Sequence, residues 1–488
     1  MSARYAMSAV LSRHWRAALI AAAGFATMVG TSTVAVVAGA GAAEATAPSP
    51  VAGGEGGKGD HGKAGKEGKG KKGDHDKGDK GGHEGQGGHD GDKRHGHGGD
   101  GKRFVECDPN ALVAAIVELN EESGGELVLA KRCTYTLTDN QDGNGLPQIT
   151  QPISIHGNGA TIARAANADQ FRIFAVAAGG DLKLSHLTLT RGKTADDGSG
   201  GAVDVSEAGR LTLDHVDVVD NTVDEIENNN GNEGGGVNTA GITTIRHSEF
   251  RGNSSDDGAA VFNEDGRLEV KSSKFTRNFA DPSNDGLAAI YTDGVAKISD
   301  SLISDNNSDF AGAIENDGLL ELEKSAVINN VAVDGAGAIY GSLATYIRDS
   351  LIKGNTSTQA NAGGIENAGS MLLDRSEVIN NATAVSSPIG GSGGGGIYMD
   401  SGAEAAIRDS KVSGNQAPGN GAQGGGIFVS ENAVVNLTDS KVSGNISDEA
   451  AGGIQNEGTV ETHGKVKIID NVPTNCDGST NPVPNCFG

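Results

Sequence analysis

The chain has 488 residues, of which 77 are glycine and only 4% are aromatic, and its net charge is −25 at pH 7. Most of the negative charge lies after position 103, where 24 Lys and Arg accompany 53 Asp and Glu, a net charge of −29. An acidic surface repels nucleic-acid phosphates and anionic lipids. We therefore expect no nucleic-acid partner and no adsorption to membranes, whereas cations and neutral glycans are suitable partners.

Residues 1–47 have the composition of a secretory signal peptide. Basic residues end at Arg16, an apolar stretch follows, and small-residue cleavage sites such as Ala45-Thr46-Ala47 come next. The stretch from Ala17 to Ala43 is also long enough to be an uncleaved membrane anchor. Its many Gly, Ala and Thr residues make it weakly hydrophobic, which favours cleavage. We expect a secreted protein, extracellular or associated with the cell surface, with no membrane attachment after cleavage.

Residues 48–103 form a low-complexity segment of Gly, Lys, Asp, Glu and His. Between positions 53 and 101 no aliphatic residue is larger than Ala, so the segment cannot bury a core and we expect a disordered linker. A solvated spacer is the favoured interpretation. The alternative is capture of transition-metal ions by imidazoles, with His95 and His97 as candidate ligands.

Four cysteines lie at the two ends of the remaining chain. They allow three pairings, and the local pairs Cys107 with Cys133 and Cys476 with Cys486 are favoured because the repeats separate the two ends. A metal site is the competing interpretation, but the chain lacks a C-x-x-C pair and export favours oxidation. We divide this part into a cap with the first coils (104–200), repeats (201–475) and a C-terminal disulfide loop (476–488).

A short motif recurs ten times between Val203 and Asn471. Each copy opens on small residues and an aliphatic residue, continues through alternating apolar positions to S-x-V or S-x-I, and closes on Asn. The closing residues are separated by 24 to 34 positions, a period typical of stacked repeats. They are Asn221, Asn253, Asn278, Asn306, Asn330, Asn355, Asn381, Asn415, Asn445 and Asn471.

The copies predict three short strands per coil and about 10–12 coils, an all-β parallel β-helix. The second strand alternates apolar residues, as in Leu320 and Leu322, which is a period of two rather than the 3.6 of a helix. The same parity places a recurring serine of the third strand inside, and the closing asparagine falls at a turn. Asparagines stacked in register can hydrogen-bond from coil to coil, so we interpret them as a structural ladder.

These copies resemble the polymorphic outer membrane protein repeat. The resemblance rests on GGAV at 200–203, AGAI at 311–314, FRGN at 250–253 and FTRN at 275–278. It implies a right-handed parallel β-helix over about 104–475, and the lead-in segment resembles the cap of secreted bacterial β-helix proteins, with a helix from about Pro109 to Leu119. Most copies close with Val or Ile instead of Phe, and no C-terminal membrane barrel is present, so adhesion is an expectation by analogy alone.

The residue after each opening aliphatic is expected to point outward, because alternate residues of a strand face opposite sides. Coils lie about 4.8 Å apart, so this column would form a lateral stripe of rings and carboxylates suited to sugars. The competing interpretation is that bulky residues favour strands and stack on one another or lie under loops. The candidate ligand-binding residues are Phe262, Tyr291, Glu315, Tyr340, Glu366, Tyr398 and Phe428.

Two functional hypotheses follow. The first is an exported, non-catalytic protein that binds glycan or another extracellular polymer through a lateral face, with no catalytic residue assigned. The alternative is a polysaccharide lyase or glycoside hydrolase. Glu315 and Glu366 lie two coils apart, about 10 Å, which exceeds the spacing of an inverting carboxylate pair. A lyase of this fold would need a calcium-binding acidic cluster and a nearby Arg or Lys.

Calcium without catalysis is the one cofactor left open. DNQDGNG at 139–145 offers acid and amide side chains and two turn glycines, but it lacks the closing Glu of a calcium loop. A plain turn is therefore favoured there. We expect no other cofactor, and no metal ligand beyond the linker histidines.

Overall fold

The computed structural model describes residues 102–194, 198–224, 233–281, 286–360, 362–383, 393–419 and 421–488. The chain divides into two units, Met1–Arg94 and His95–Gly488, and every described residue belongs to the second. The expected signal peptide, nearly all of the expected linker and the candidate ligands His95 and His97 lie outside the described residues. Within the described ranges, no helix is long and apolar enough to cross a membrane.

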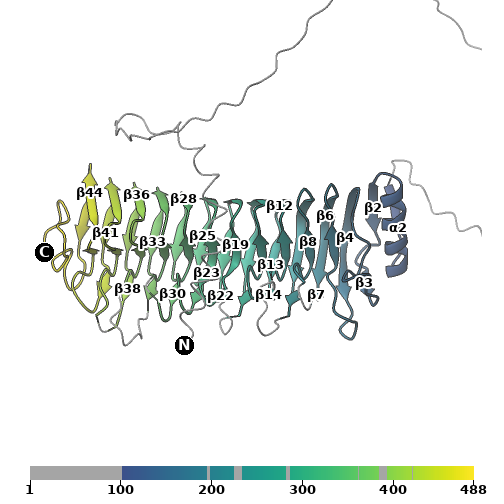
Figure 1. The fold of residues 1–488 in the computed structure, drawn as a ribbon, viewed down its shortest axis with the longest axis horizontal. Helices are drawn as coiled ribbons and strands as arrows, with labels where there is room; N and C mark the ends of the chain where they lie inside the picture. The colour runs from purple at the N-terminus through teal and green to yellow at the C-terminus, as the bar shows by residue number, and fades with distance from the viewer. Residues whose placement is uncertain are drawn as a thin grey trace, which may run out of the picture. The chain divides into compact units, whose positions relative to one another are not determined.

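The chain winds into a parallel β-solenoid of about 13 turns, slightly more than the expected 10–12, because coils that lack a closing asparagine precede the repeats. Figure 1 shows successive coils side by side in chain order, with the helix α2 at the N-terminal end. Every strand pair between coils is parallel, as in Val237 beside Val261 and Phe250 beside Phe275. Each full coil passes through three sheets in turn, which we name the opening, bent and closing sheets.

The opening sheet contributes the first strand of each coil. Its strands are β5 (Phe174–Val176), β8 (Val203–Val205), β11 (Val237–Thr239), β15 (Val261–Asn263), β19 (Ala288–Thr292), β23 (Ala311–Asn316), β27 (Ile339–Gly341), β31 (Ile365–Asn367), β35 (Ile397–Met399), β39 (Ile427–Val429) and β43 (Ile454–Asn456).

The bent sheet contributes two segments per coil that meet at a corner. In β4, β6 and β9 one strand runs through this corner, whereas later coils split it into two strands. Its members are β1 (Lys102–Val105), β2 (Gly125–Leu129), β3 (Thr134–Leu137), β4 (Pro152–Arg164), β6 (Asp181–Thr190), β9 (Arg210–Val219), β12 (Ile242–Arg246), β13 (Glu249–Arg251), β16 (Arg267–Lys271), β17 (Lys274–Thr276), β20 (Val295–Ser299), β21 (Leu302–Ser304), β24 (Leu319–Glu323), β25 (Ala326–Ile328), β28 (Ala344–Arg348), β29 (Leu351–Lys353), β32 (Ser370–Asp374), β33 (Glu377–Ile379), β36 (Glu404–Arg408), β37 (Lys411–Ser413), β40 (Val434–Thr438), β41 (Lys441–Ser443), β44 (Thr459–His463) and β45 (Lys467–Ile469).

The closing sheet contributes a two-residue strand after each asparagine. Its strands are β7 (Lys193–Thr194), β10 (Thr222–Val223), β14 (Ser254–Ser255), β18 (Phe279–Ala280), β22 (Asn307–Ser308), β26 (Val331–Ala332), β30 (Thr356–Ser357), β34 (Ala382–Thr383), β38 (Gln416–Ala417) and β42 (Ile446–Ser447).

The corner of the bent sheet is formed by a residue with positive φ in nearly every coil, for example His215 at 57° and Lys324 at 47°. A left-handed residue turns the strand without breaking the pairing between coils, and His, Asn and Asp adopt this region more readily than most residues. We name these residues the corner column. Its members are His186, His215, His247, Ser272, Asp300, Lys324, Asp349, Arg375, Asp409 and Asp439.

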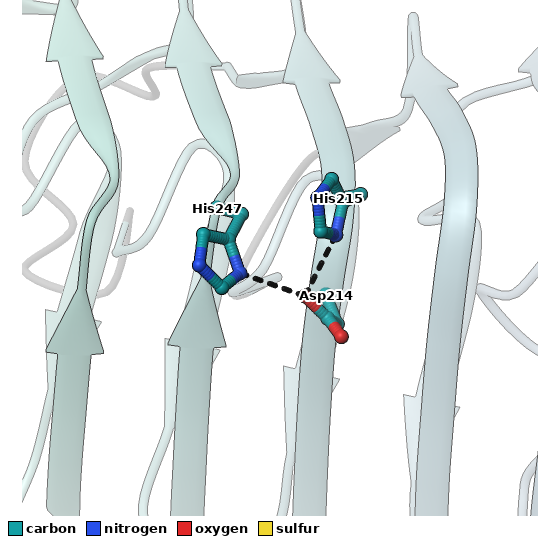
Figure 2. Close-up of side chains that lie close together, drawn as sticks. All are labelled: Asp214, His215 and His247. Atoms are coloured by element: carbon teal, nitrogen blue, oxygen red, sulfur yellow. Dashed lines mark hydrogen bonds and ion pairs between the residues drawn. The ribbon is translucent and has the colours of Figure 1, made fainter.

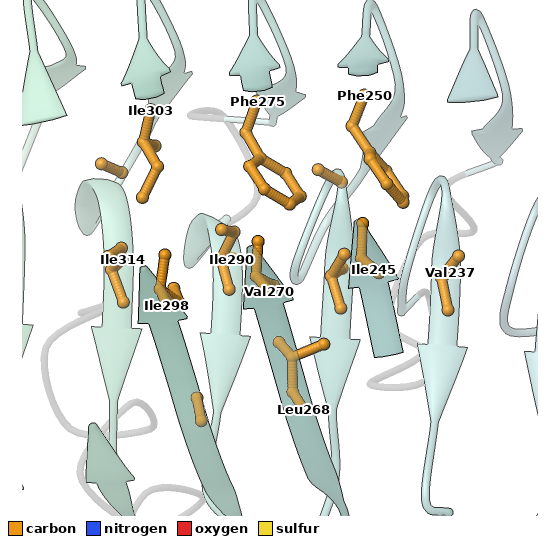
Figure 3. Close-up of a cluster of buried hydrophobic side chains, with 14 of the residues drawn as sticks. Val237, Ile245, Phe250, Leu268, Val270, Phe275, Ile290, Ile298, Ile303 and Ile314 are labelled. Carbon is orange, nitrogen blue, oxygen red and sulfur yellow. The ribbon is translucent and has the colours of Figure 1, made fainter. Parts of the chain in front are cut away.

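The hydrophobic core fills the inside of the coils. Alternate strand residues point inward and meet their equivalents one coil away, as Val237, Ile245 and Phe250 do in Figure 3. Phe250 stacks on Phe275 with ring centroids 4.9 Å apart. Burying each such side chain contributes about 1.5–3 kcal/mol, and this repeated burial holds the corner at a fixed place on every coil.

A helix covers the N-terminal end of the core. α2 spans Pro109–Glu121, two residues beyond the expected end at Leu119, and buries Leu112, Ile116 and Leu119. The Asp108 side chain accepts a hydrogen bond from the Asn110 amide at 2.9 Å, which caps the helix. The first disulfide joins Cys107, just before α2, to Cys133, just before β3.

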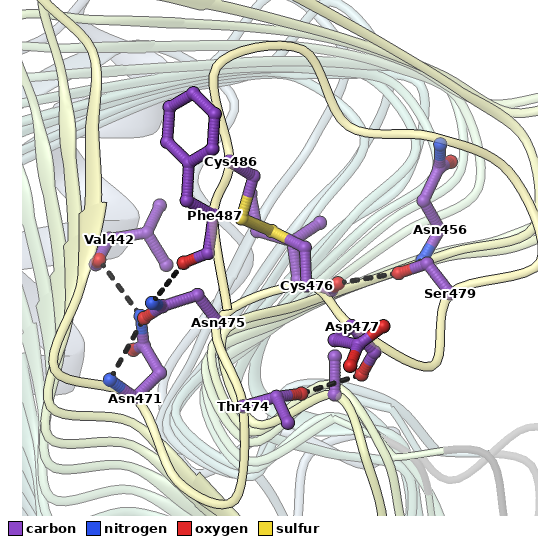
Figure 4. The surroundings of a disulfide bond; sticks show 12 residues. Val442, Asn456, Asn471, Thr474, Asn475, Cys476, Asp477, Ser479, Cys486 and Phe487 are labelled. Atoms are coloured by element: carbon purple, nitrogen blue, oxygen red, sulfur yellow. Dashed lines mark hydrogen bonds between the residues drawn. A yellow bond between two sulfur atoms is a disulfide. The ribbon is translucent and has the colours of Figure 1, made fainter.

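The C-terminal loop covers the other end (Figure 4). The second disulfide, Cys476–Cys486, closes this loop. The Ser479 hydroxyl donates to the Ile454 carbonyl at 2.9 Å, and Asn475 Nδ2 donates to the Phe487 carbonyl at 2.8 Å. The loop thereby supplies the last coil with hydrogen-bond partners that a further coil would otherwise provide.

Candidate functional site

The asparagine column forms a continuous hydrogen-bonded ladder. From Asn221 onward, each Nδ2 donates to Oδ1 of the next closing asparagine at 2.9–3.0 Å. The ladder ends on Asn475, which accepts from Asn471 at 3.0 Å and is one member that the repeat pattern missed. These side chains are buried and saturated with hydrogen bonds, so they have no capacity left for a ligand.

The recurring serines form a second ladder inside the corner. Each backbone amide donates to the hydroxyl of the next serine at 3.0–3.2 Å. Most of the hydroxyls in turn donate to the carbonyl two residues earlier, as Ser325 does to Glu323 at 2.8 Å. Both ladders therefore hold the coils in register and fix the outer side chains at the corner.

The predicted stripe on the opening sheet is in register but is not exposed. Consecutive members pair across coils from Phe262 to Phe428. Phe262, Tyr291, Glu315, Tyr398 and Phe428 are 2%, 4%, 4%, 8% and 3% exposed, and Tyr340 and Glu366 are half-buried. The expectation of an open face of rings and carboxylates is therefore wrong.

Two kinds of contact cover the stripe. Rings stack on one another across coils, with centroids 4.6 Å apart for Phe262–Tyr291 and 5.2 Å apart for Tyr398–Phe428. Residues of the turns that precede the opening strands, Ala336 and Ala362, pack on the rings from outside the core. Covering the rings removes apolar surface from water, which stabilises the folded protein. Rings left exposed for a ligand would lose this stabilisation.

The two carboxyl groups of the stripe have pKa values far from their ordinary range. Burial raises the pKa of Glu366 to about 8, with Asp400 and Asp334 adding in the same direction. Burial also raises the pKa of Glu315 well above its usual value, and its Oε2 has no hydrogen-bond partner among the described residues. Tyr340 lies between them in register. Because Glu315 is enclosed, a polymer does not reach this pair, and the pair gives the enzyme hypothesis no support.

The DNQDGNG segment forms a turn closed by its own groups. Asn140 Oδ1 accepts from the Gly143 amide at 2.7 Å, and Asn144 Nδ2 donates to the Gln141 carbonyl at 3.3 Å. This geometry agrees with the favoured interpretation of a plain turn, and calcium stays the open alternative.

Two cavities lie on the corner column. The first, of about 600 Å³, spans five coils and includes Ser272, Asp300, Lys324, Asp349 and Arg375. The second, of about 620 Å³, lies nearer the N-terminal cap and includes His186 and His215. Both are open hollows where the two segments of the bent sheet meet. We name the outer surface along this column, which is hollowed at these two places, the corner groove.

The first cavity carries charges of both signs. Arg375 makes a bidentate pair with Asp349, with Nε and Nη2 at 2.8 and 2.9 Å from the two carboxylate oxygens. The hydrogen bonds from Arg375 lower the pKa of Asp349 below its usual value. Lys324 pairs with Glu323 at 3.0 Å. These exposed pairs contribute little to stability, so they stay available to exchange partners with a polar ligand.

The second cavity holds a feature that the sequence interpretation missed. Four histidines of successive coils, His156, His186, His215 and His247, form a column of rings with neighbouring centroids 4.7–5.3 Å apart. Asp214 Oδ1 accepts from Nδ1 of His215 at 2.9 Å and of His247 at 3.1 Å (Figure 2). The available signal was the corner position itself, where three coils in succession carry His186, His215 and His247. The serine that follows the corner in later coils is replaced by Leu187 and Val216 in the first two, so the serine pattern did not align these histidines.

Comparison with known proteins shows the fold. A family model described as "right handed beta helix region" matches residues 285–472. The described residues form a right-handed parallel β-helix. The narrower resemblance to polymorphic outer membrane protein repeats stays a prediction. No curated protein matches the sequence.

Two solved structures are similar to this chain at low sequence identity and low TM-score. The A-module of the mannuronan C-5 epimerase AlgE6 of Azotobacter vinelandii is 15% identical, with a TM-score of 0.28, over 77% of this chain and 92% of that chain. A mutant tailspike protein of the E. coli bacteriophage HK620, solved in complex with a pentasaccharide, is 12% identical, with a TM-score of 0.32, over 74% of each chain.

Proposed function

We propose that this is an exported, non-catalytic β-helix protein that binds an extended glycan along the corner groove. The observation that carries the proposal is that both cavities lie on one register column, so a linear polymer meets equivalent positions in successive coils. The groove replaces the buried stripe as the binding face. Its hydroxyl, carboxylate and cationic side chains suit the hydroxyls of neutral sugars and the carboxylates of acidic ones.

Export fits the covalent structure. Two disulfides staple the ends of the solenoid, and disulfides persist in oxidising, extracellular compartments. The expected signal peptide and the resemblance to surface-exposed repeat proteins agree with this location. The acidic surface disfavours nucleic acid and anionic membrane, which leaves extracellular polymers as the partner class.

Affinity electrophoresis and calorimetry with a panel of soluble polysaccharides test the proposal. The informative variant is Asp349→Asn with Arg375→Asn, because Asn tolerates the positive φ of both positions while removing the ion pair. The matched control is Lys297→Gln with Glu321→Gln, an exposed pair at 2.9 Å on the bent sheet that lies outside the cavities.

We expect at least one polysaccharide to bind, with at least about tenfold weaker binding, 1.4 kcal/mol, in the groove variant and no change in the control. Binding that is equal in both variants, or no binding across the panel, contradicts the proposal. Incubation with and without calcium, followed by assays for reducing ends and unsaturated products, tests the enzyme alternative. Product release would overturn the non-catalytic part of the proposal.

A further inference from the structure

Asp214, His215 and His247 bring three metal-ligating groups to one point on the outside of the solenoid. Asp214 is the last outward residue before the corner on β9, and His215 is the corner residue that follows it. His247 occupies the same corner position one coil later, so the stacking of coils places it beside His215, with ring centroids 4.8 Å apart. The cluster is therefore built by the register of the fold and not by a flexible loop.

The ligand atoms already converge. Nδ1 of both imidazoles points at the same oxygen of Asp214, at 2.9 and 3.1 Å, and one ligand atom from each residue lies within 4.8 Å of the others. Zinc binds imidazole nitrogen at about 2.0–2.1 Å and carboxylate oxygen at about 2.0–2.2 Å, so tetrahedral ligand atoms lie about 3.4 Å apart. Small side-chain movements would open the present hydrogen-bonded cluster to that spacing.

We propose that Asp214, His215 and His247 bind one first-row transition-metal ion of the zinc class. Imidazole nitrogens select zinc, copper or nickel over calcium and magnesium, which prefer oxygen ligands alone. The three side chains are each about half exposed, at 46%, 51% and 49%, so an ion reaches them directly from solvent. The fourth position is left to water.

Each Nδ1 now donates to the carboxylate. For Nδ1 to bind an ion its proton must leave to solvent, which frees the in-plane lone pair, and Nε2 then carries the ring proton. His186 stacks on His215 with centroids 4.7 Å apart and fixes its ring. Asp217 and Lys131 line the same cavity, so the charge around the cluster is balanced and the ion would be held by its three ligands.

This site is independent of the glycan proposal, because neither requires the other to be correct. The competing explanation is that Asp214 only accepts two hydrogen bonds that align the rings. The two explanations differ in what zinc does to the folded protein. A bound ion stabilises the native state by mass action, whereas a purely hydrogen-bonded cluster gives no such response.

The test compares full-length protein with His215→Asn plus His247→Asn, since Asn accepts the positive φ of both positions. The control is His463→Asn, a histidine paired with Glu461 at 3.5 Å at the far end of the bent sheet. Zinc bound after equilibrium dialysis is measured by elemental analysis, and the unfolding midpoint is measured with and without zinc. Because the linker histidines are unchanged in every variant, only the difference between variants reports on this site.

We expect the double variant to bind one zinc ion fewer than the wild type and the control, and to lose the zinc-dependent rise in unfolding midpoint. Asp214→Asn, which keeps both imidazoles and the side-chain shape, is expected to lose at least about tenfold in affinity, which keeps the test valid if the double variant folds poorly. Equal zinc content and equal midpoint shifts in the wild type and the variants would overturn the site.

Discussion

The asparagine ladder and the corner column both place one residue per coil at a fixed position, yet they differ in what they allow. Inside, ten coils repeat the same residue, because each amide needs an identical neighbour to complete its hydrogen bonds away from water. At the corner the residue changes from His to Ser, Asp, Lys and Arg, because water satisfies any of them. The asparagine ladder therefore contributes to stability and cannot vary in sequence. The residues of the corner column can vary, because they are solvated and not needed as hydrogen-bond partners between coils.

The largest expected effect lies in the ladder. Asn330→Ala removes the oxygen that accepts from both the backbone and the side chain of Asn306, and it removes the amide group that donates to the Ile303 carbonyl and to Asn355 Oδ1. Buried groups without partners cost about 1–3 kcal/mol each, so we expect a loss of about 4 kcal/mol in the free energy of unfolding. Chemical denaturation measures it. Asn307→Ala, at an exposed position on β22, is the control, and equal losses in the two variants would show that the ladder has no special role.

Next comes the C-terminal cap. Replacing Cys476 and Cys486 by Ser reopens a loop with a sequence separation of 10, which is expected to cost about 2–3 kcal/mol. Because the loop supplies the last ladder member, Asn475, fraying should begin in the final coil. Hydrogen exchange monitored by mass spectrometry should show faster exchange in β43 to β45 than in the central coils. Uniform acceleration along the whole chain would contradict a local capping role.

The covered stripe predicts a pH dependence of stability. The pKa of Glu366 is raised to about 8 from an ordinary value of 4.5. Between these values the unfolded chain releases a proton that the folded protein retains, so this group makes stability fall as pH rises from about 4.5 to 8. Glu366→Gln should therefore match the wild type at pH 4 and exceed its unfolding midpoint at pH 8.

The control for that prediction is Glu404→Gln, an exposed carboxylate at the start of β36. Its unfolding midpoint should follow the wild type across the same pH range. A Glu366→Gln variant that gains no stability at pH 8 would show that the carboxyl group is hydrated and that the stripe is not closed.

The smallest effect on stability is expected at the corner itself. Arg375→Asn removes an exposed ion pair with Asp349 and keeps a residue that accepts positive φ. We expect the free energy of unfolding to stay equal to that of the wild type within experimental error, because water solvates both charges. Thermal and chemical unfolding both measure it. A loss comparable to that of Asn330→Ala would mean that the corner column is structural and would remove the contrast with the ladder.

Much of the fold could be predicted from the sequence because the inner columns repeat one residue type in phase. The period-two pattern and the closing asparagines predict the coils, and Pro109 after Asp108 indicates the start of the helix. The candidate site could not be placed in the same way. Strand parity shows that Phe262 and Tyr398 leave the core, but it carries no information on the turns that fold back over them.

The histidine cluster shows the reverse case. Asp214 and His215 are neighbours in one copy, but His247 belongs to the next copy and lies 32 positions after His215 in the sequence. Only the register between β9 and β12 brings them together. Contacts between coils depend on where each copy begins, and the insert lengths between copies obscure this in a linear alignment.

The position of a bound glycan can be determined in a crystal structure of the protein with an oligosaccharide of the polymer that it binds most tightly. We expect a sugar chain in the corner groove, parallel to the solenoid axis, in contact with Lys324, Asp349 and Arg375. A sugar chain seated over the opening sheet, with the turns displaced from Tyr340 and Tyr398, would contradict it.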